Sequence, residues 1–90
     1  MESIWVFSGV GAHFPAGIFS SRDKAEVWVK AHHLSGTLTK YPVDIGLYDW
    51  ALAHGFFHVR AEDQKAPEFI QRFTTAGHEH HHYQDGLCCV

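Results

Sequence analysis

A chain of 90 residues is long enough for one domain with its own hydrophobic core, and 46% of these residues are apolar. The net charge is −3 with neutral histidines, and no cluster of Lys or Arg occurs, so the composition argues against binding to nucleic acid. No apolar run approaches the ~18 residues that a membrane span requires, so no membrane association is expected.

The first elements are predicted to be a β-hairpin. The run SIWVFS at residues 3–8 is rich in β-branched and aromatic residues, and GIFS at 17–20 is a second, shorter run of this kind. The connection between them, GVGAHFPAG, contains three glycines and a proline, which is typical of a turn region.

A helix is predicted next, capped by Ser20 or Ser21 and running to about residue 32 or 33. Glu26 and Lys30 lie on its polar face in the favoured order for an i,i+4 ion pair. Its apolar positions recur at helical spacing, at Ala25, Trp28, Val29 and His32.

The middle of the chain predicts a strand followed by a second helix. Alternating residues at 35–43 indicate the strand, which Pro42 either ends or places at a sheet edge. Asp44 is expected to cap a helix over 45–54, and Gly55 to end it with a left-handed conformation. Residues 56–60, FFHVR, indicate another short strand.

The last third of the chain predicts a short helix and a closing strand. Pro67 is a favourable first residue for the helix. The segment 78–83 lacks helical periodicity, which indicates a strand at the sheet edge, and a frayed tail is expected from about residue 85. We therefore expect a single domain over 1–90 with a two-layer α+β fold. Its small, mostly antiparallel sheet would carry two main helices and a short third helix on one face.

Four stretches of sequence are distinctive: WVFSG (5–9), FPAGIFSS with the following segment to GFF (14–57), PEFIQRF (67–73) and EHHHY (79–83). In these stretches the sequence resembles a family of small bacterial proteins of unknown function. The resemblance covers nearly the whole chain and implies a stand-alone α+β domain, but it implies no activity, cofactor or catalytic residue.

The histidine-rich segment HEHHH raises the question of a metal site. On a strand, His78, His80 and His82 would share one face, while Glu79, His81 and Tyr83 would share the other. Zinc, nickel or copper would suit the histidines, with His54, His58 or one of the cysteines as a further ligand. The alternative is a solvent-facing edge strand that binds metal weakly and incidentally, with Tyr83 as an inward anchor, and we favour this reading. No cofactor is expected.

No catalytic motif is present, so an enzyme is not expected. The two adjacent cysteines, Cys88 and Cys89, do not form a disulfide framework, and a cytoplasmic location fits them best. The expected role is that of a small binding or regulatory protein, immunity-like in size, that acts on a protein partner. Self-association through the edge strand is a further expectation.

The candidate contact residues cluster around the second predicted helix, because aromatic residues are frequent anchors of protein interfaces. They are Tyr41, Tyr48, Asp49 and Trp50. Within the helix we expect Tyr48 and Leu52 to face the sheet, and Asp49 and Trp50 to face outward.

Overall fold

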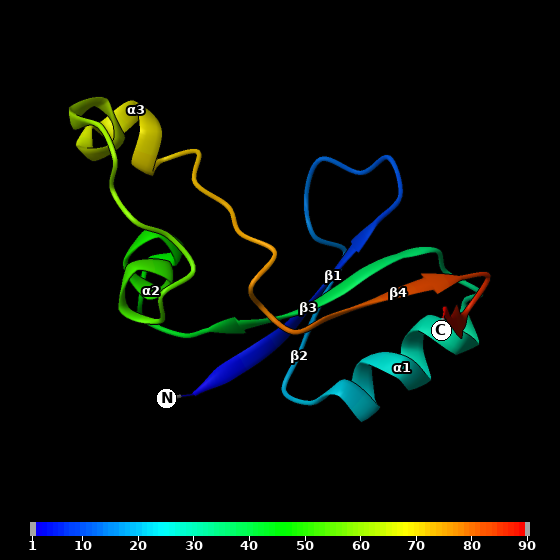
Figure 1. The fold of residues 1–90 in the computed structure, drawn as a ribbon. Helices are drawn as coiled ribbons and strands as arrows, with labels where there is room; N and C mark the ends of the chain where they lie inside the picture. Colours follow the sequence, from blue (N-terminus) through cyan, green and yellow to red (C-terminus); the bar gives the residue numbers. More distant parts are fainter. Residues whose placement is uncertain (1, 90) are drawn as a thin grey trace. The chain divides into compact units, whose positions relative to one another are not determined.

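A computed structural model describes residues 2–89 (Figure 1). The elements are β1 (Ser3–Gly9), β2 (Gly17–Phe19), α1 (Arg22–Ala31), β3 (Gly36–Pro42), α2 (Leu47–Ala53), the 3-10 helix η1 (Glu62–Lys65), α3 (Pro67–Ile70), β4 (His80–Gln84) and β5 (Leu87–Cys88). This confirms an α+β fold with an antiparallel sheet, two main helices and a short third helix.

Residues 2–89 group into two compact units. The sheet unit comprises the described chain as far as Val43 and again from His78, and the helical unit comprises Asp44–Gly77. Helix α1 belongs to the sheet unit, and α2 and α3 belong to the helical unit.

The sheet unit is built on five antiparallel strands in the order β2-β1-β3-β4-β5. β1 and β3 are the longest pair and run from Ser3 opposite Pro42 to Gly9 opposite Gly36 (Figure 1). A Cβ on Gly36 would meet the backbone Cα of Gly9 at 2.8 Å, so glycine permits the close approach of these two strands.

The closing strand differs from the predicted edge strand. β4 begins at His80 and lies between β3 and β5, so the sheet edges are β2 and the two-residue β5. Asp85 and Gly86 have φ values of 50° and 88°, a left-handed pair that reverses the chain into a tight hairpin. The segment that was expected to be a frayed tail from about residue 85 therefore pairs with β4 as far as Cys88.

Helix α1 confirms the predicted amphipathic element. The Ser21 hydroxyl accepts a hydrogen bond from the Lys24 N–H at 3.2 Å, which is a normal N-cap. Ala25 and Val29 are buried against the sheet, while His32, expected on the same stripe, is the exposed C-cap residue. The core between helix and sheet consists of Trp5, Phe7, Ala25, Val29, Leu38 and Tyr83.

The helical unit confirms some predicted signals and corrects others. Gly46, without a side-chain bond, is the N-cap of α2, whereas Asp44 has a φ of 66° and lies before the helix. Gly55 has a φ of 77° and ends the helix as predicted. Residues 56–60 form no strand, because the Phe56 N–H turns back to the Ala51 carbonyl at 2.9 Å.

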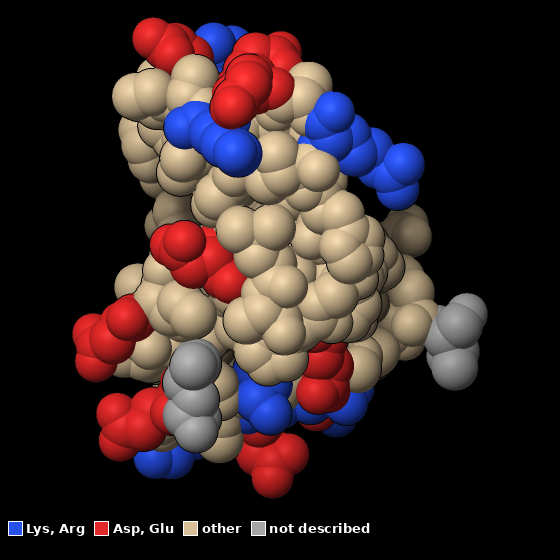
Figure 2. Space-filling model, turned by 60° about the vertical axis from the view of Figure 1, so that its left-hand side comes forward, with Lys and Arg blue, Asp and Glu red and all other residues tan. Residues whose placement is uncertain are grey.

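Among residues 2–89, no helix combines the length and the apolar character that crossing a bilayer requires. On the face shown in Figure 2, basic and acidic side chains are intermingled and do not gather into a patch of one sign. This distribution agrees with the lack of any Lys/Arg cluster in the sequence, and this face offers no basic surface for a phosphate backbone.

Candidate functional site

The three histidines proposed as a metal triad are not brought together. His80 and His82 are exposed on β4, but His78 lies before the strand and is only 4% exposed, with its ring centre 5.2 Å from that of Tyr41. Within the described part of the chain, no group of three His, Cys, Asp or Glu side chains is arranged to hold a metal ion. The expectation that the histidines face solvent therefore holds for His80 and His82 and is wrong for His78.

His80 and His82 nevertheless lie together. They alternate with His81 and Tyr83 along the strand, so they project from the face of the sheet opposite to α1. Their ring centres are 5.4 Å apart and their planes are nearly perpendicular, at 86°. Each ring uses Nδ1 in a hydrogen bond, at 2.8 Å from the His78 carbonyl for His80 and at 3.3 Å from the Thr37 hydroxyl for His82.

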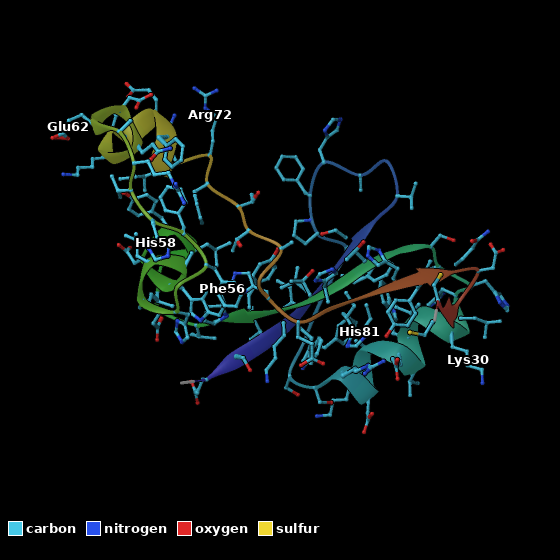
Figure 3. All side chains as sticks on the ribbon, viewed as in Figure 1. Lys30, Phe56, His58, Glu62, Arg72 and His81 are labelled. Carbon is cyan, nitrogen blue, oxygen red and sulfur yellow. The ribbon has the colours of Figure 1, made fainter. Side chains whose placement is uncertain are left out.

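His81 belongs to the opposite face of the sheet and serves the fold. Its ring is stacked 6.0 Å from that of Trp5, and its Nε2 lies 2.9 Å from a carboxylate oxygen of Glu79. The hydrogen bond with His81 lowers the pKa of the Glu79 carboxyl. Figure 3 shows His81 on the β4 strand of the sheet unit.

Tyr83 is the inward anchor that the strand alternation predicted. It is only 4% exposed, and its hydroxyl donates a 2.6 Å hydrogen bond to the Glu26 carboxylate on α1. Arg22 holds the same carboxylate at 3.2 Å, so Glu26 pairs with Arg22 and not with Lys30 as predicted. The hydrogen bond from Tyr83 lowers the pKa of Glu26, and burial together with that bond raises the pKa of Tyr83 to about 12.

Tyr48, one of the contact candidates, is a core residue of the helical unit. Its hydroxyl donates a 2.9 Å hydrogen bond to the Gln64 carbonyl. Its buried ring packs in an aromatic cluster with Phe57, Phe69 and Phe73. Leu52, expected to face the sheet, is 37% exposed.

The other contact candidates lie in different surroundings. Asp49 is exposed on α2, and Trp50 is half-buried. The Trp50 ring stacks on that of His54 at 4.5 Å and on that of Phe56 at 5.3 Å, and Figure 3 shows Phe56 beside α2. Tyr41 is half-buried on β3 of the sheet unit, so it does not belong to the helical unit with Asp49 and Trp50.

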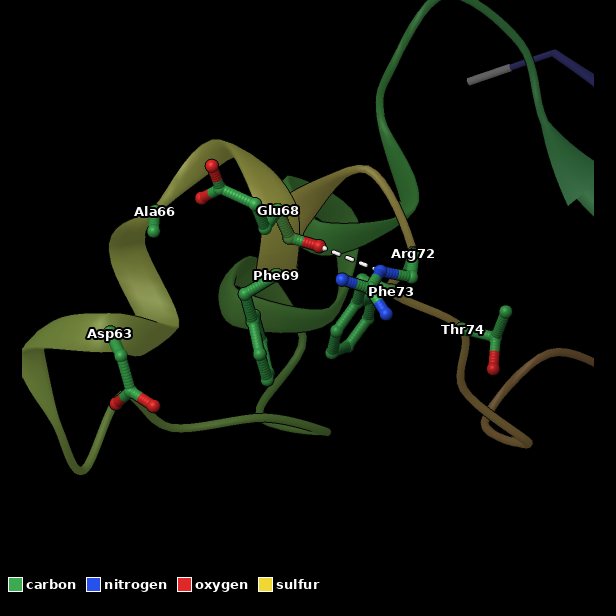
Figure 4. A pocket seen from close by; sticks show the side chains of 7 residues that line it. All are labelled: Asp63, Ala66, Glu68, Phe69, Arg72, Phe73 and Thr74. Atoms are coloured by element: carbon green, nitrogen blue, oxygen red, sulfur yellow. Dashed lines mark hydrogen bonds between the residues drawn. The ribbon is translucent and has the colours of Figure 1, made fainter.

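A hollow of about 600 Å³ opens beside α3 in the helical unit (Figure 4). Phe69 and Phe73 contribute apolar lining, and Asp63, Glu68 and Arg72 contribute charges. The Arg72 Nε donates to the Glu68 carbonyl at 3.3 Å, which holds part of the guanidinium against α3. Because the lining carries both signs of charge, it favours no single class of charged ligand.

Among the large apolar side chains of residues 2–89, the most exposed lie in the connection between β1 and β2, which was predicted only as a turn region. Val10 and Phe14 are each 81% exposed. Val10 also contributes to a groove of about 550 Å³, whose lining residues are Phe7, Gly9, Val10, Ala16, Trp28, His32, Leu34 and Ser35. The available signal was the presence of two large apolar residues in a Gly/Pro-rich loop, where polar residues are usual.

Taken together, these features define a small α+β domain whose most exposed apolar surface lies beside a five-stranded antiparallel sheet. The chain belongs to the family described as Domain of unknown function (DUF7710), whose model matches residues 4–89. Neither a curated protein nor a solved structure matches the chain.

Proposed function

We propose that this chain is a small non-enzymatic binding module that recognises an apolar segment of another protein. The single observation that carries the proposal is the apolar loop surface, which we define as Val10 and Phe14 together with the adjoining groove of the sheet unit. Large apolar side chains left this exposed on a folded domain are typical of interaction sites.

The loop that carries this surface is held in place by backbone hydrogen bonds. The Val10 N–H donates to the Ser35 carbonyl at 3.0 Å, and the Ala16 N–H donates to the Phe7 carbonyl at 2.8 Å. A further bond, at 3.0 Å, joins the Ala12 N–H to the Gly9 carbonyl. Because these bonds already fix the loop, the loop loses less conformational entropy when a partner binds.

The chemistry of the surface favours an apolar partner. Neither loop residues 10–16 nor the groove residues include Asp, Glu, Lys or Arg, so His13 and His32 are the titratable groups of this surface. The groove wall is formed in part by Trp28 and Leu34, both of which are half-buried and also pack on the core. An aromatic or aliphatic side chain entering this groove would bury apolar area on both partners without stranding a charge.

A non-catalytic role fits the way in which the polar side chains are used. The Nδ1 of His54 lies 2.9 Å from the Trp50 carbonyl, four residues earlier on α2. Glu26 is engaged by Tyr83 and Arg22, and these bonds tie β4 to α1. The exposed, free thiols of Cys88 and Cys89 suit a reducing cytoplasm, where we place this regulatory or immunity-like bacterial protein.

The proposal can be tested by photo-crosslinking in the host cell. Benzoylphenylalanine is placed at position 14, or at position 27 as the matched control, since Val27 is also a surface apolar residue, 71% exposed on α1. We expect one discrete crosslinked protein from position 14 and none from position 27. The proposal is wrong if position 14 gives no crosslink, or if both positions give the same set of products.

A further inference from the structure

The face of the sheet opposite to α1 carries a pair of exposed imidazoles on β4. In the β3–β4 register, Thr37 lies opposite His82 and Thr39 lies opposite His80. Both histidines are exposed, and their neighbours in the two strands are threonines, so they project from a polar part of the sheet. This location is separate from the apolar loop surface.

Because the hydrogen bonds of the two rings use Nδ1, the lone pair on each Nε2 is available to bind a metal ion. A carbonyl oxygen can only accept, so the 2.8 Å contact of the His80 Nδ1 with the His78 carbonyl places the ring proton on Nδ1. The Thr37 hydroxyl is able to accept from the His82 Nδ1 in the same way. Metal-binding histidines are typically oriented by such a bond from the second ring nitrogen.

The spacing of the rings also suits a single ion. Imidazole nitrogens bind first-row transition metals at about 2.0–2.1 Å, which places the centres of two rings on one tetrahedral ion roughly 5 Å apart. The observed ring centres are 5.4 Å apart. This separation is compatible with both rings binding the same ion through Nε2.

We propose that His80 and His82 chelate one divalent transition-metal ion through their Nε2 atoms, on the face of the sheet opposite to α1. Ions that prefer imidazole ligands, namely Zn²⁺, Ni²⁺ and Cu²⁺, are the class that this pair would take. His78 is not a ligand, because it is buried beside Tyr41. Thr37 is a positioning residue that acts through His82, and water or a partner's side chains fill the remaining coordination positions.

The test is a calorimetric titration of the purified full chain with Ni²⁺ chloride, with Zn²⁺ chloride as a second probe. We compare the double variant His80→Ala/His82→Ala with His32→Ala/His33→Ala, which removes the same number of exposed histidines from the end of α1. We expect the β4 double variant to weaken binding at least tenfold and the α1 double variant to change it less than twofold. Thr37→Val should weaken binding on the order of tenfold, the usual effect of removing a hydrogen bond to a metal-binding histidine.

A second readout identifies the bound atoms without any substitution. In ¹⁵N spectra of the wild-type imidazoles, Zn²⁺ should shift the Nε2 signals of His80 and His82 first. The proposal is overturned if those signals move no earlier than those of the other histidines. It is equally overturned if the two double variants lose affinity to the same extent, because binding would then be an unspecific property of a histidine-rich chain.

Discussion

Replacing Tyr83 with Phe removes one hydroxyl and leaves the buried ring in place. The hydroxyl donates its 2.6 Å hydrogen bond to a carboxylate, and bonds to charged groups contribute about 1.5–3 kcal/mol. The Glu26 side chain is 35% exposed, so we expect the lower end of this range, about 1.5 kcal/mol. In a domain of this size that loss corresponds to a fall of roughly 6–12 °C in melting temperature.

The pH dependence of this loss follows from the two perturbed groups. The pKa of Glu26 is lowered by folding from its ordinary value of 4.5, so its contribution to stability is present above that pH and is lost as pH falls through the folded value. The pKa of Tyr83 is raised from 10.0 to about 12, so its contribution is present below pH 10.0 and is lost as pH rises towards 12. Between these two pH ranges the wild type should therefore be more stable than Tyr83→Phe by the full difference in free energy of unfolding. At lower and at higher pH the difference should be smaller.

Thermal unfolding followed by circular dichroism over this pH range measures both effects. Tyr41→Phe is the matched control, since Tyr41 is a half-buried tyrosine on the neighbouring strand β3. A double-mutant cycle with Glu26→Gln isolates the energy of the Tyr83–Glu26 pair. Equal melting temperatures for the wild type and Tyr83→Phe at pH 7, or a difference that does not change below pH 4.5, would refute this reasoning.

Three further outcomes are expected. Tyr48→Phe should destabilise the helical unit by about 1 kcal/mol, because the 2.9 Å hydrogen bond to the Gln64 carbonyl is lost. Hydrogen exchange of the α2 amides measures this loss, and unchanged exchange would contradict a stabilising role of that bond. Gly36→Ala should destabilise the sheet by more than Gly9→Ala, because a Cβ at position 36 would lie 2.8 Å from the Gly9 Cα, whereas a Cβ at position 9 would make only ordinary contacts at 3.8 Å and beyond. Similar urea midpoints for the two variants would be the contrary result. EDTA should leave the melting temperature within about a degree, because folding does not depend on a metal ion held by only two exposed histidines. A fall of many degrees would indicate a structural metal instead.

The parts of the fold that local patterns determine were predictable from the sequence. The hairpin, α1 with its Ser21 cap, and the turn at Gly55 each follow from residues that are close in the chain. The alternation in the histidine segment was enough to assign Tyr83 to the core and to place His80 and His82 on the other face. Periodicity of two fixes the face of each strand residue once the strand itself is recognised.

The errors concern features that depend on distant contacts. His78 was expected to face solvent because the strand was assumed to begin there, but pairing with β3 places the start of β4 at His80. The Arg22–Glu26 pair has the helical i,i+4 spacing, but the second partner of Glu26, Tyr83, could not be predicted from that spacing because it lies 57 residues away in the chain. The exposure of Val10 was missed for the same reason, since the groove that it lines also includes Trp28 and His32 of α1 and Leu34 and Ser35 of the following loop.

The assignment of the apolar loop surface as the binding site is tested by the affinity of purified variants of this chain for the protein captured at position 14. We predict that Phe14→Ala weakens binding at least tenfold, a loss of about 1.4 kcal/mol, as expected for an aromatic anchor of an interface. Val27→Ala should change the affinity less than twofold, and both variants should melt within a few degrees of the wild type because both side chains are exposed. An unchanged affinity for Phe14→Ala, measured on folded protein, would contradict the assignment of the apolar loop surface as the binding site.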